Sequence, residues 1–325
     1  MPAETTFELK LGMATREAFG RALVELGREN RDVVVVDADL SKSTFTHLFA
    51  QEFPERFVSC GIAEANMVGV AAGLAVAGKI AFAASFAAFA VNKGFEQLRV
   101  LAAYPPEVNL KLVGTHAGIS IGEDGPSQMS VEDIALACSL PGFTVISPAD
   151  EVSTGALVRA AAAHRGPVYI RVGRPKVPVI YQPGRRFQIG QAVEVVGGTD
   201  LTIIATGLLL SEAIRAWEQL RTEGISARVL DMHTIKPLDV GAIARAAAET
   251  GAIVTAEEHL VEGGLGVRVA QAVVESHPCP MEFVGIRNTY AESGTPGELC
   301  EKYGLVARDV IAAAHRVLQR KKHAL

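Results

Sequence analysis

Short apolar runs rich in β-branched residues alternate along this chain with longer segments in which apolar residues recur every three or four positions. The short runs predict buried strands, and the longer spacing predicts helices that bury one face. In the first half, strands are predicted at residues 33–36, 79–84, 108–114, 144–146 and 168–171, and helices at 15–28, 64–77, 87–103, 131–139 and 151–164. Apolar strands interleaved with helices are typical of a largely parallel sheet that helices cover on both faces.

A second unit with the same alternation follows residues 173–186, a segment rich in proline, glycine and charge that is predicted to be a linker. Its predicted strands are 201–207, 227–230 and 252–255, and its first predicted helix is 211–223. The first of these strands ends in Thr206-Gly207, a position at which open α/β sheets bind ligands. A chain of 325 residues exceeds one ordinary core. The predicted fold class is therefore α/β with two domains, each a largely parallel sheet flanked by helices.

Composition and charge exclude several classes of partner. The formal net charge is −5 and the pI about 5.9, which argues against nucleic-acid binding, and the basic cluster Arg320-Lys321-Lys322 is interpreted as a frayed helix end. No apolar run is long enough to span a bilayer, and residues 1–11 lack the apolar core of a signal peptide. The four cysteines are scattered without metal-like spacing. We therefore expect reduced thiols in a cytoplasmic protein that has no membrane partner.

The segment 60–75 places one carboxylate, that of Glu64, at the start of a helix whose other positions are apolar or small. Apolar residues such as Met67, Val70 and Leu74 recur at helical spacing, and alanine and glycine fill most of the rest, so the helix is expected to be almost wholly buried. A helix N-terminus stabilises an acid there. Taken alone, Glu64 is therefore most simply interpreted as a residue that starts a helix.

Three further segments carry polar or aromatic groups at predicted strand ends. Residues 36–43 end a strand in acids and hydroxyls, which an ordinary capped turn would also explain. Residues 83–90 place Phe86 and Phe89 three apart among alanines, where they could pack a core or wall a slot for a flat ring. Residues 114–128 form a long glycine-punctuated loop with a histidine, two acids and a glutamine. Because that loop leaves a buried strand at the edge where α/β active sites form, it favours a functional interpretation.

Together these segments resemble the transketolase family over essentially the whole chain. The residues that carry the resemblance are Ala14-Thr15-Arg16-Glu17, Ile62-Ala63-Glu64, Asn66-Met67, Ser85-Phe86-Ala87-Ala88-Phe89 and Gly122-Glu123-Asp124-Gly125-Pro126-Ser127-Gln128-Met129. The family's pyrimidine-binding domain maps onto residues 12–180 and its C-terminal domain onto residues 190–318. The resemblance implies an enzyme that uses thiamine diphosphate to transfer a two-carbon ketol unit from a ketose phosphate to an aldose phosphate.

The resemblance also implies roles for four residues that bind the cofactor. Glu64 contacts the aminopyrimidine ring and, by sharing a proton with a ring nitrogen, favours the imino form that deprotonates the thiazolium carbon. Phe89 stacks on the pyrimidine, Phe86 lines the same pocket, and Asp39 lies toward the thiazolium side. Two departures from the family pattern, Lys93 for arginine and Asn92 for tyrosine, fall in this pocket.

By the same resemblance, the sugar substrates contact a second set of residues. Arg16, Ser43 and Arg174 hold a phosphate, a task for which arginine's forked donors are suited. His116 and Asp124 bind hydroxyls near the reacting carbons, and His116 joins Glu64 as a catalytic residue. Gln128 stands where many bacterial and yeast-type members carry histidine and animal-type members carry glutamine. The sequence does not distinguish phosphorylated from branched or sulfonated sugars.

The chain lacks the family element that binds the diphosphate end of the cofactor. Full-length transketolases are about twice as long, and their first half carries a Gly-Asp-Gly…Asn motif that ligates a divalent metal and the diphosphate. No Gly-Asp-Gly occurs here. We therefore predict no metal ligands in this chain and an N-terminal partner subunit that binds most of the Mg²⁺ or other divalent ion. Self-association into a homodimer, and with the partner into a heterotetramer, is also expected.

Three other functions remain open at this point. The β subunit of a 2-oxo acid dehydrogenase E1 component has a similar length and architecture, but residues 85–86 and 122–127 favour transketolase. A 1-deoxyxylulose-5-phosphate synthase-like enzyme is disfavoured because such enzymes are longer single chains. A non-catalytic transketolase-like partner is disfavoured by the intact set Glu64, Phe89, His116 and Asp124. In the second domain, His259 is interpreted as a packing or interface residue, and the domain itself as an aid to assembly.

Overall fold

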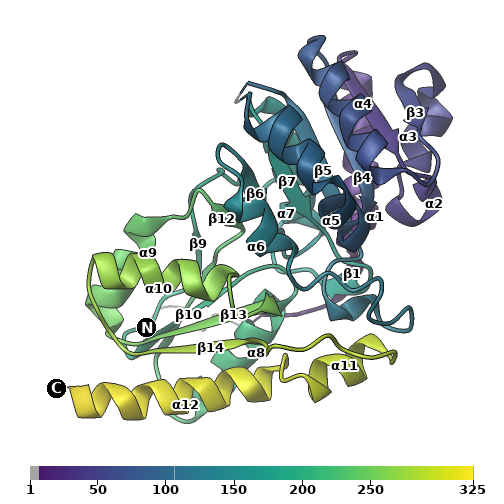
Figure 1. Ribbon diagram of the computed structural model, residues 1–325. Helices are drawn as coiled ribbons and strands as arrows, with labels where there is room; N and C mark the ends of the chain where they lie inside the picture. Colours follow the sequence, from purple (N-terminus) through teal and green to yellow (C-terminus); the bar gives the residue numbers. More distant parts are fainter. Residues whose placement is uncertain (1–6, 106, 325) are drawn as a thin grey trace.

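The computed structural model describes residues 7–105 and 107–324, in which strands and helices alternate (Figure 1). The strands are β1 (Leu11–Ala14), β2 (Val33–Asp37), β3 (Phe57–Ser59), β4 (Ile80–Phe86), β5 (Leu110–Thr115), β6 (Thr144–Ile146), β7 (Val168–Arg171), β8 (Lys176–Pro178), β9 (Val193–Val196), β10 (Leu201–Ala205), β11 (Ala227–Asp231), β12 (Thr234–Lys236), β13 (Ile253–Leu260) and β14 (Met281–Ile286). The α-helices are α1 (Thr15–Glu29), α2 (Ser41–Thr44), α3 (His47–Glu52), α4 (Glu64–Val76), α5 (Ala87–Gln97), α6 (Asp133–Ser139), α7 (Glu151–Ala163), α8 (Leu209–Thr222), α9 (Val240–Thr250), α10 (Leu265–Glu275), α11 (Pro296–Lys302) and α12 (Ala307–Ala324). Short turns η1 (Pro54–Arg56) and η3 (Ile119–Ile121) are 3₁₀-helical, and η2 (Leu98–Ala103) continues α5 as a π-helix.

The first sheet has seven strands in the order β12-β6-β7-β5-β4-β2-β3, and all neighbours are parallel except β12 and β6. Every residue of β2 and of β5 is buried, as expected for strands that helices cover on both faces. In this parallel arrangement the carboxyl ends of β2, β4 and β5 lie side by side, so the segments that follow them meet at one edge of the sheet.

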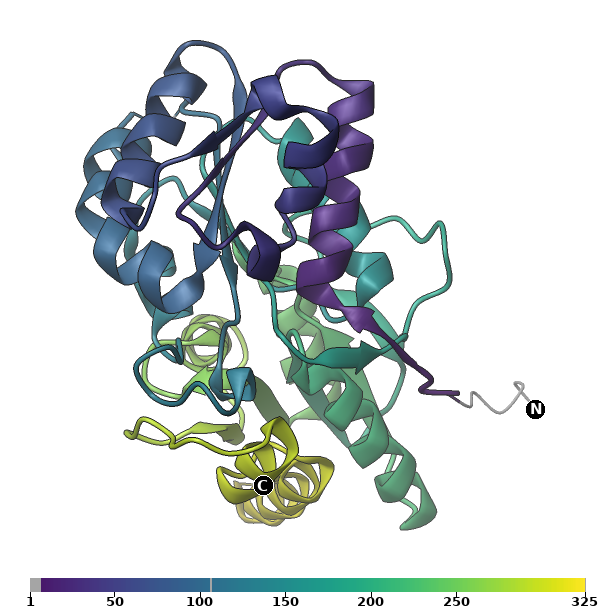
Figure 2. The ribbon, with the colours of Figure 1, turned by 90° about the vertical axis from the view of Figure 1, so that its right-hand side faces the viewer.

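The second sheet has five strands in the order β14-β13-β10-β11-β9, with β9 as an antiparallel edge. Helices α9 and α10 lie on one side of this sheet, and α8 and α12 on the other (Figure 1). Figure 2 shows the two halves stacked, with the purple and blue elements of the first above the green and yellow elements of the second. The predicted fold class, two α/β domains with largely parallel sheets, is confirmed.

Two strands pair in ways that the local pattern did not predict. Part of the predicted linker forms β8, which pairs antiparallel with β1 and buries Val177. Strand β12, which lies beyond the linker, crosses to the first sheet and pairs with β6. Both are three-residue strands whose partners lie more than 80 positions away, so only the tertiary fold determines their pairing.

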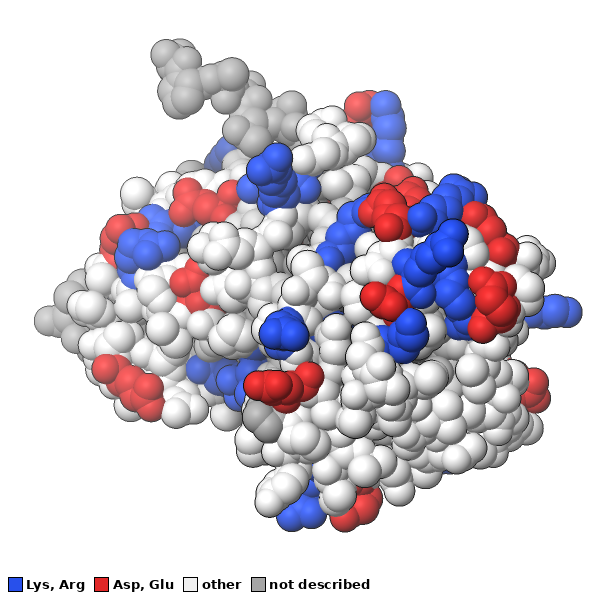
Figure 3. Space-filling model, turned by 90° about the horizontal axis from the view of Figure 1, so that it is seen from above, with Lys and Arg blue, Asp and Glu red and all other residues white. Residues whose placement is uncertain are grey.

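Helix α4 is buried on one side only, and the expectation of an almost wholly buried helix is wrong for this chain. Its open side includes Val76 at 73% exposure, and Ile62 just before the helix is 80% exposed. Helix α4 packs against η2, where Gly69 lies against Leu101. The apolar side chains of Val100 and Leu101 in η2 and of Tyr104 in the turn after it are also exposed. Figure 3 shows a broad area without charged side chains at its lower right, on the side where Figure 1 places α4. We call Ile62, Gly69, Val76, Val100, Leu101 and Tyr104 the open α4 face.

One smaller expectation is also corrected. The cluster 320–322 is part of the ordered helix α12, where Arg320 donates to the carbonyl of Met281 and Lys321 to that of Thr250. The turn at Gly207 lies against the first domain, since a Cβ there would lie 2.7 Å from Ser147 Oγ, and it lines a small cavity with Ser120 and Glu258.

On the face seen in Figure 3, basic and acidic side chains are interspersed. None of the helices among the described residues has the length and apolar character needed to cross a membrane. Residues 1–6, most of the region examined for a signal peptide, lie outside the described residues.

Candidate active site

The predicted site residues come from segments that leave the carboxyl edge of the first sheet or lie against it. Asp39 and Ser43 follow β2, Phe86 ends β4, Phe89 lies in the next helix α5, and His116 follows β5. Arg174 follows β7, Glu64 begins α4, and Arg16 lies in the first turn of α1. The sheet topology therefore brings residues that lie far apart in the sequence to one edge of the sheet, as in other open parallel sheets.

His116 is held by three neighbours at the end of β5. Arg16 Nη1 lies 2.9 Å from His116 Nε2, and Thr115 Oγ1 lies 2.8 Å from Nδ1. A guanidinium can only donate, so Nε2 accepts and the ring proton is on Nδ1. The Phe86 ring stacks on the imidazole with its centroid 3.8 Å away. His116 is therefore a fixed neutral imidazole whose Nε2 lone pair faces a cation.

Burial, and then the charges of Arg16 and Arg174, lower the pKa of His116 to about 3. A histidine in an unfolded chain titrates near 6.5, so between about pH 6.5 and 3 only the unfolded state gains this proton. We predict that His116 makes the folded state less stable as the pH falls through that range, by at most about 1.4 kcal/mol per pH unit.

Urea unfolding at pH 7, 6 and 5 tests this prediction, with His116→Asn expected to have a shallower pH dependence than the wild type. His233 is also buried and its pKa is lowered to about 4, so it contributes to the wild-type slope, and the difference between the two proteins isolates His116. The same substitution at the exposed His277 is the control. Equal slopes for wild type and His116→Asn would contradict the prediction.

Glu64 pairs with an ammonium group that also lies over an aromatic ring. Its side chain is 4% exposed, and its carboxylate oxygens lie 3.2 and 3.4 Å from Lys93 Nζ. The same Nζ lies 4.6 Å from the centroid of Phe89, whose ring is stacked on that of Phe86 at 5.7 Å and 12°. A buried carboxylate, a flat aromatic face and a half-exposed cation therefore converge at the start of α4.

Two arginines face the loop that His116 begins. Arg16 Nη1 donates to the carbonyl of Ser43 at 2.8 Å, and Arg174 lies 3.8 Å from Asp124 Oδ1. Arg174 also donates to the carbonyl of Ile121. Burial, and then the charge of Arg174, lower the pKa of Arg16, and Arg174 is itself paired with Glu123 at 3.1 Å. An anion bound near both guanidiniums would offset the unfavourable effect of one charge on the other.

Two predicted residues stand apart from these contacts. Asp39 is exposed at φ 64°, and Gln128 is half-buried in a turn where its backbone N–H donates to Gly125. Among the described residues neither side chain makes a hydrogen bond or ion pair to the other predicted site residues.

Sequence reasoning missed two residues that organise this site. Asp37 is fully buried, and its carboxylate accepts from Thr44 Oγ1, Thr46 Oγ1 and the N–H of Leu40, which fixes the loop of Asp39 and Ser43. Lys93 was noted only as a departure from the family pattern, yet it pairs with Glu64. The spacing of Lys93 four residues after Phe89 placed both on one helix face and could have indicated their contact.

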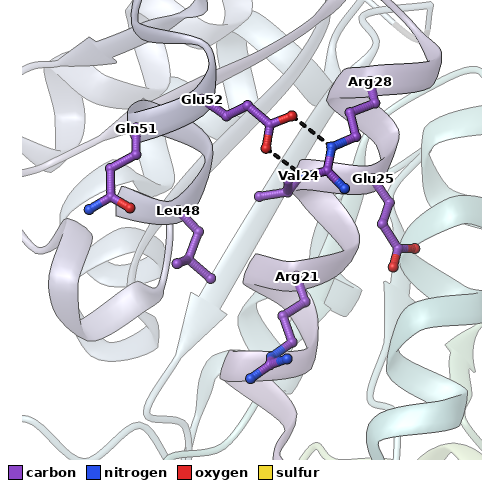
Figure 4. Close-up of a pocket in the computed structure, with 7 residues that line it drawn as sticks. All are labelled: Arg21, Val24, Glu25, Arg28, Leu48, Gln51 and Glu52. Atoms are coloured by element: carbon purple, nitrogen blue, oxygen red, sulfur yellow. Dashed lines mark hydrogen bonds and ion pairs between the residues drawn. The ribbon is translucent and has the colours of Figure 1, made fainter.

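An open groove between α1 and α3 (Figure 4) offers no comparable chemistry. Its two arginines are matched by carboxylates, since Arg28 donates to Glu52 at 2.6 and 2.7 Å and Arg21 to Glu17 at 2.7 Å. We therefore place the candidate site at the carboxyl edge of the first sheet.

Comparison with known proteins identifies the family. The family model "Transketolase, pyrimidine binding domain" matches residues 12–179, and "Transketolase, C-terminal domain" matches residues 190–310. The chain belongs to the transketolase family. It is 41% identical over 316 residues to the 6-deoxy-6-sulfo-D-fructose transketolase subunit SqwH of Clostridium sp. (strain MSTE9), covering 97% of this chain and 98% of that one.

Two further comparisons place this transketolase-family chain within the family. It is 42% identical over 325 residues to human transketolase, covering 99% of this chain and 51% of that enzyme, so it spans about half the length of this relative. A solved structure of a split gene transketolase, described as an inactive beta4 tetramer, has a TM-score of 0.90 and 50% identity, covering 95% of this chain and 100% of that one.

The residues of this transketolase-family chain fit one end of thiamine diphosphate, the cofactor that the family implies. A buried carboxylate beside a half-buried phenyl face suits a flat ring that carries a nitrogen donor. In residues 7–105 and 107–324, no three His, Cys, Asp or Glu side chains form a group that could hold a metal ion.

Proposed function

We propose that this chain is the C-terminal subunit of a split thiamine-diphosphate-dependent transketolase. The observation that carries the proposal is Glu64, buried at the start of α4 beside Phe89, in a chain with no Gly-Asp-Gly element. The pyrimidine half of a site is present without the half that holds diphosphate and metal. The reaction is the transfer of a two-carbon ketol unit from a ketose phosphate to an aldose phosphate.

Each residue near Glu64 has a distinct role in this proposal. Thiamine diphosphate, when bound, supplies a carbon nucleophile that carries the two-carbon unit. With the cofactor bound, the Glu64 carboxyl group would share a proton with a pyrimidine nitrogen. Phe89 and Phe86 would supply the aromatic wall, and Asp39, exposed in the loop after β2, would lie toward the thiazolium side. Lys93 contacts Glu64 in this chain and, with half of its side chain exposed, is free to move when a ring enters.

The remaining residues bind the sugar. Arg16 and Arg174 repel each other and so favour an anionic group between them, with Ser43 beside Arg16. His116 is held neutral with its Nε2 lone pair on Arg16, so it accepts from a sugar hydroxyl once Arg16 turns to the anionic group, and Asp124 and Gln128 bind further hydroxyls. A sugar phosphate carries the anionic group that the two arginines favour. The SqwH relative, whose name specifies a sulfonated sugar, makes a sulfosugar the second candidate.

A partner subunit completes the site in this proposal. The open α4 face leaves large apolar side chains uncovered on and beside the helix that Glu64 begins, which is typical of a surface that another chain covers. An N-terminal subunit supplies the diphosphate and divalent-metal ligands, and copies of this chain associate with each other. The split relative is described as a tetramer of one chain type and as inactive, which fits a chain that needs its partner.

Reconstitution tests the proposal. We expect the chain with Mg²⁺ and thiamine diphosphate alone to show no ketol transfer above background, and addition of an N-terminal subunit to restore it. Transfer is measured with a phosphorylated and a sulfonated ketose, each against an aldose phosphate acceptor. Full transfer by the chain alone would overturn the partner requirement. Oxidative decarboxylation of a 2-oxo acid in place of transfer would overturn the reaction.

A further inference from the structure

The loop of residues 116–125, which carries His116 and Asp124, is held from the second domain. Glu258 lies on β13 of the second sheet, with 4% of its surface exposed. Its carboxylate accepts a hydrogen bond from the backbone N–H of Ser120 at 2.6 Å. Ser120 lies in η3, four residues after His116, so this bond reaches the middle of the loop from 138 positions away.

The loop is shaped to admit the Glu258 carboxylate. Gly118 has φ +82°, and a Cβ at this position would lie 2.1 to 2.4 Å from the carboxyl atoms of Glu258. No side chain fits there, and the left-handed backbone also favours glycine. The N–H of Gly118 donates to the carbonyl of Ser130 at 2.8 Å. Arg171 donates to that same carbonyl at 3.2 Å and to the backbone carbonyl of Glu258 at 2.8 Å. Glu258 is thus fixed at both its backbone and its side chain.

The second domain also covers the later part of the loop. A Cβ on Gly122 would lie 3.1 Å from Pro296 Cδ, and one on Gly125 would lie 2.6 Å from Ser293 Oγ. Both glycines have positive φ. Pro296 begins α11, which therefore packs against the loop directly after η3. Contacts from the second domain thus lie on both sides of Ser120.

These contacts differ from ordinary domain packing because one of them is a hydrogen bond from a loop amide to a buried carboxylate. An apolar side chain would join two domains at lower cost than a carboxylate withdrawn from water. A carboxylate accepts strong, directional hydrogen bonds, which fix a backbone group in one place. The group fixed here lies between His116, which contacts Arg16, and Asp124, which lies next to Arg174.

We propose that Glu258 is a positioning residue for the sugar-binding loop, and that the second domain thereby takes part in forming the active site. Through the Ser120 amide it holds the loop in the conformation that presents His116 and Asp124 to the substrate. The kinetic consequence rests on the proposed function, whereas the ordering of the loop does not.

Glu257 provides a matched control. It is the adjacent residue, 1% exposed, and its carboxylate also accepts two backbone N–H bonds, from Leu265 at 2.7 Å and Gly266 at 2.8 Å. Those partners lie in α10 of the second domain and not in the loop. Replacement of Glu257 therefore removes a similar buried carboxylate from the same strand without touching residues 116–125.

Amide hydrogen exchange on the free chain, resolved to the Ser120 amide, is the first measurement. We expect the Ser120 amide to exchange at least tenfold faster in Glu258→Ala than in the wild type. Glu258→Gln keeps one acceptor oxygen and should exchange at an intermediate rate. Glu257→Gln should exchange at the wild-type rate. If Glu258→Ala does not fold, the exchange rate of Ser120 in Glu258→Gln tests the proposal by itself. Unchanged exchange in both Glu258 variants, or equal acceleration in Glu257→Gln, would overturn the proposal.

Steady-state kinetics of the enzyme reconstituted with its partner is the second measurement. We expect Glu258→Ala to lower kcat/KM for the sugar at least tenfold, with the thiamine diphosphate concentration for half-maximal activity unchanged, because the Glu64 pocket is not involved. If kcat/KM for the sugar fell and the thiamine diphosphate concentration for half-maximal activity rose by the same factor, the role of Glu258 would be merely structural, and the proposal would be overturned. If wild-type enzyme shows no ketol transfer, the proposed function fails, while the exchange experiment still decides whether Glu258 orders the loop.

Discussion

Glu64→Gln is expected to lower ketol transfer by the reconstituted enzyme about 10²- to 10⁴-fold, the usual range for loss of a positioned acid or base. Glutamine keeps the shape of the side chain but cannot exchange a proton with a ring nitrogen. Because Glu64 is 4% exposed, a carboxylate dissolved in the buffer does not easily take the place of its side chain. The measurement is the initial rate of transfer at saturating thiamine diphosphate and sugar, compared with wild type.

Two controls separate this effect from damage to the fold. The paired ammonium of Lys93 is 52% exposed, so Glu64→Gln leaves no charge stranded in the interior, and the thermal midpoint is expected to stay close to that of wild type. Glu96→Gln removes an acid that is 69% exposed on α5, the helix that carries Lys93, and is expected to leave the rate unchanged. Retention of more than about a tenth of the rate by Glu64→Gln would contradict the catalytic role. Such a result would favour the non-catalytic alternative.

Arg171→Met is expected to reduce the free energy of unfolding by about 3–5 kcal/mol, the range found when one partner of a buried ion pair is removed. Arg171 Nε lies 2.7 Å from Asp133 Oδ2, and the two side chains are 7% and 0% exposed. Burial is the largest influence and alone would raise the pKa of Asp133, but Arg171, His259 and the Tyr169 hydroxyl together outweigh it and hold that pKa below its usual range. Without Arg171, the Tyr169 hydroxyl, at 2.6 Å, is the one hydrogen-bond donor left to the carboxylate among the described residues.

Urea unfolding at pH 7 measures this loss, and Arg159→Met is the matched control. Arg159 pairs with two carboxylates, those of Glu25 at 2.8 Å and Glu29 at 2.6 Å, but its side chain is 39% exposed. Exposed ion pairs contribute little to stability because water and salt screen them, so this variant should lose much less. Equal losses in the two variants would show that burial does not determine the contribution of these arginines.

The sequence predicted much of the first sheet and one half of the site. Apolar runs such as residues 33–36 and 168–171 became buried strands because a strand covered on both faces needs apolar residues at every position. The motif around Glu64 and the pair Phe86 and Phe89 indicated a pocket, and the structure brings these groups together with Lys93. These are local signals, carried by the spacing of residues within one or two elements.

Local signals did not predict contacts between residues that lie far apart in the sequence. Arg16 and His116 lie 100 positions apart, and Ser120 and Glu258 lie 138 apart, and no periodicity links such pairs. The open α4 face was misjudged for a related reason, since small and apolar residues on all sides of a helix do not reveal which side its own chain covers. The second domain, interpreted as an aid to assembly, contacts the loop of His116 directly.

By itself, the sequence determined the α/β class, the order of the main elements and a carboxylate next to aromatic rings at a helix start, because hydrophobic period and short motifs are properties of neighbouring residues. Tertiary structure alone decided that β12 crosses to the first sheet, that His116 is a neutral imidazole beside Arg16, and that Glu258 reaches the Ser120 amide. Those features depend on hydrogen bonds and charges in a shared buried space, and such a space exists only once the two sheets have packed together.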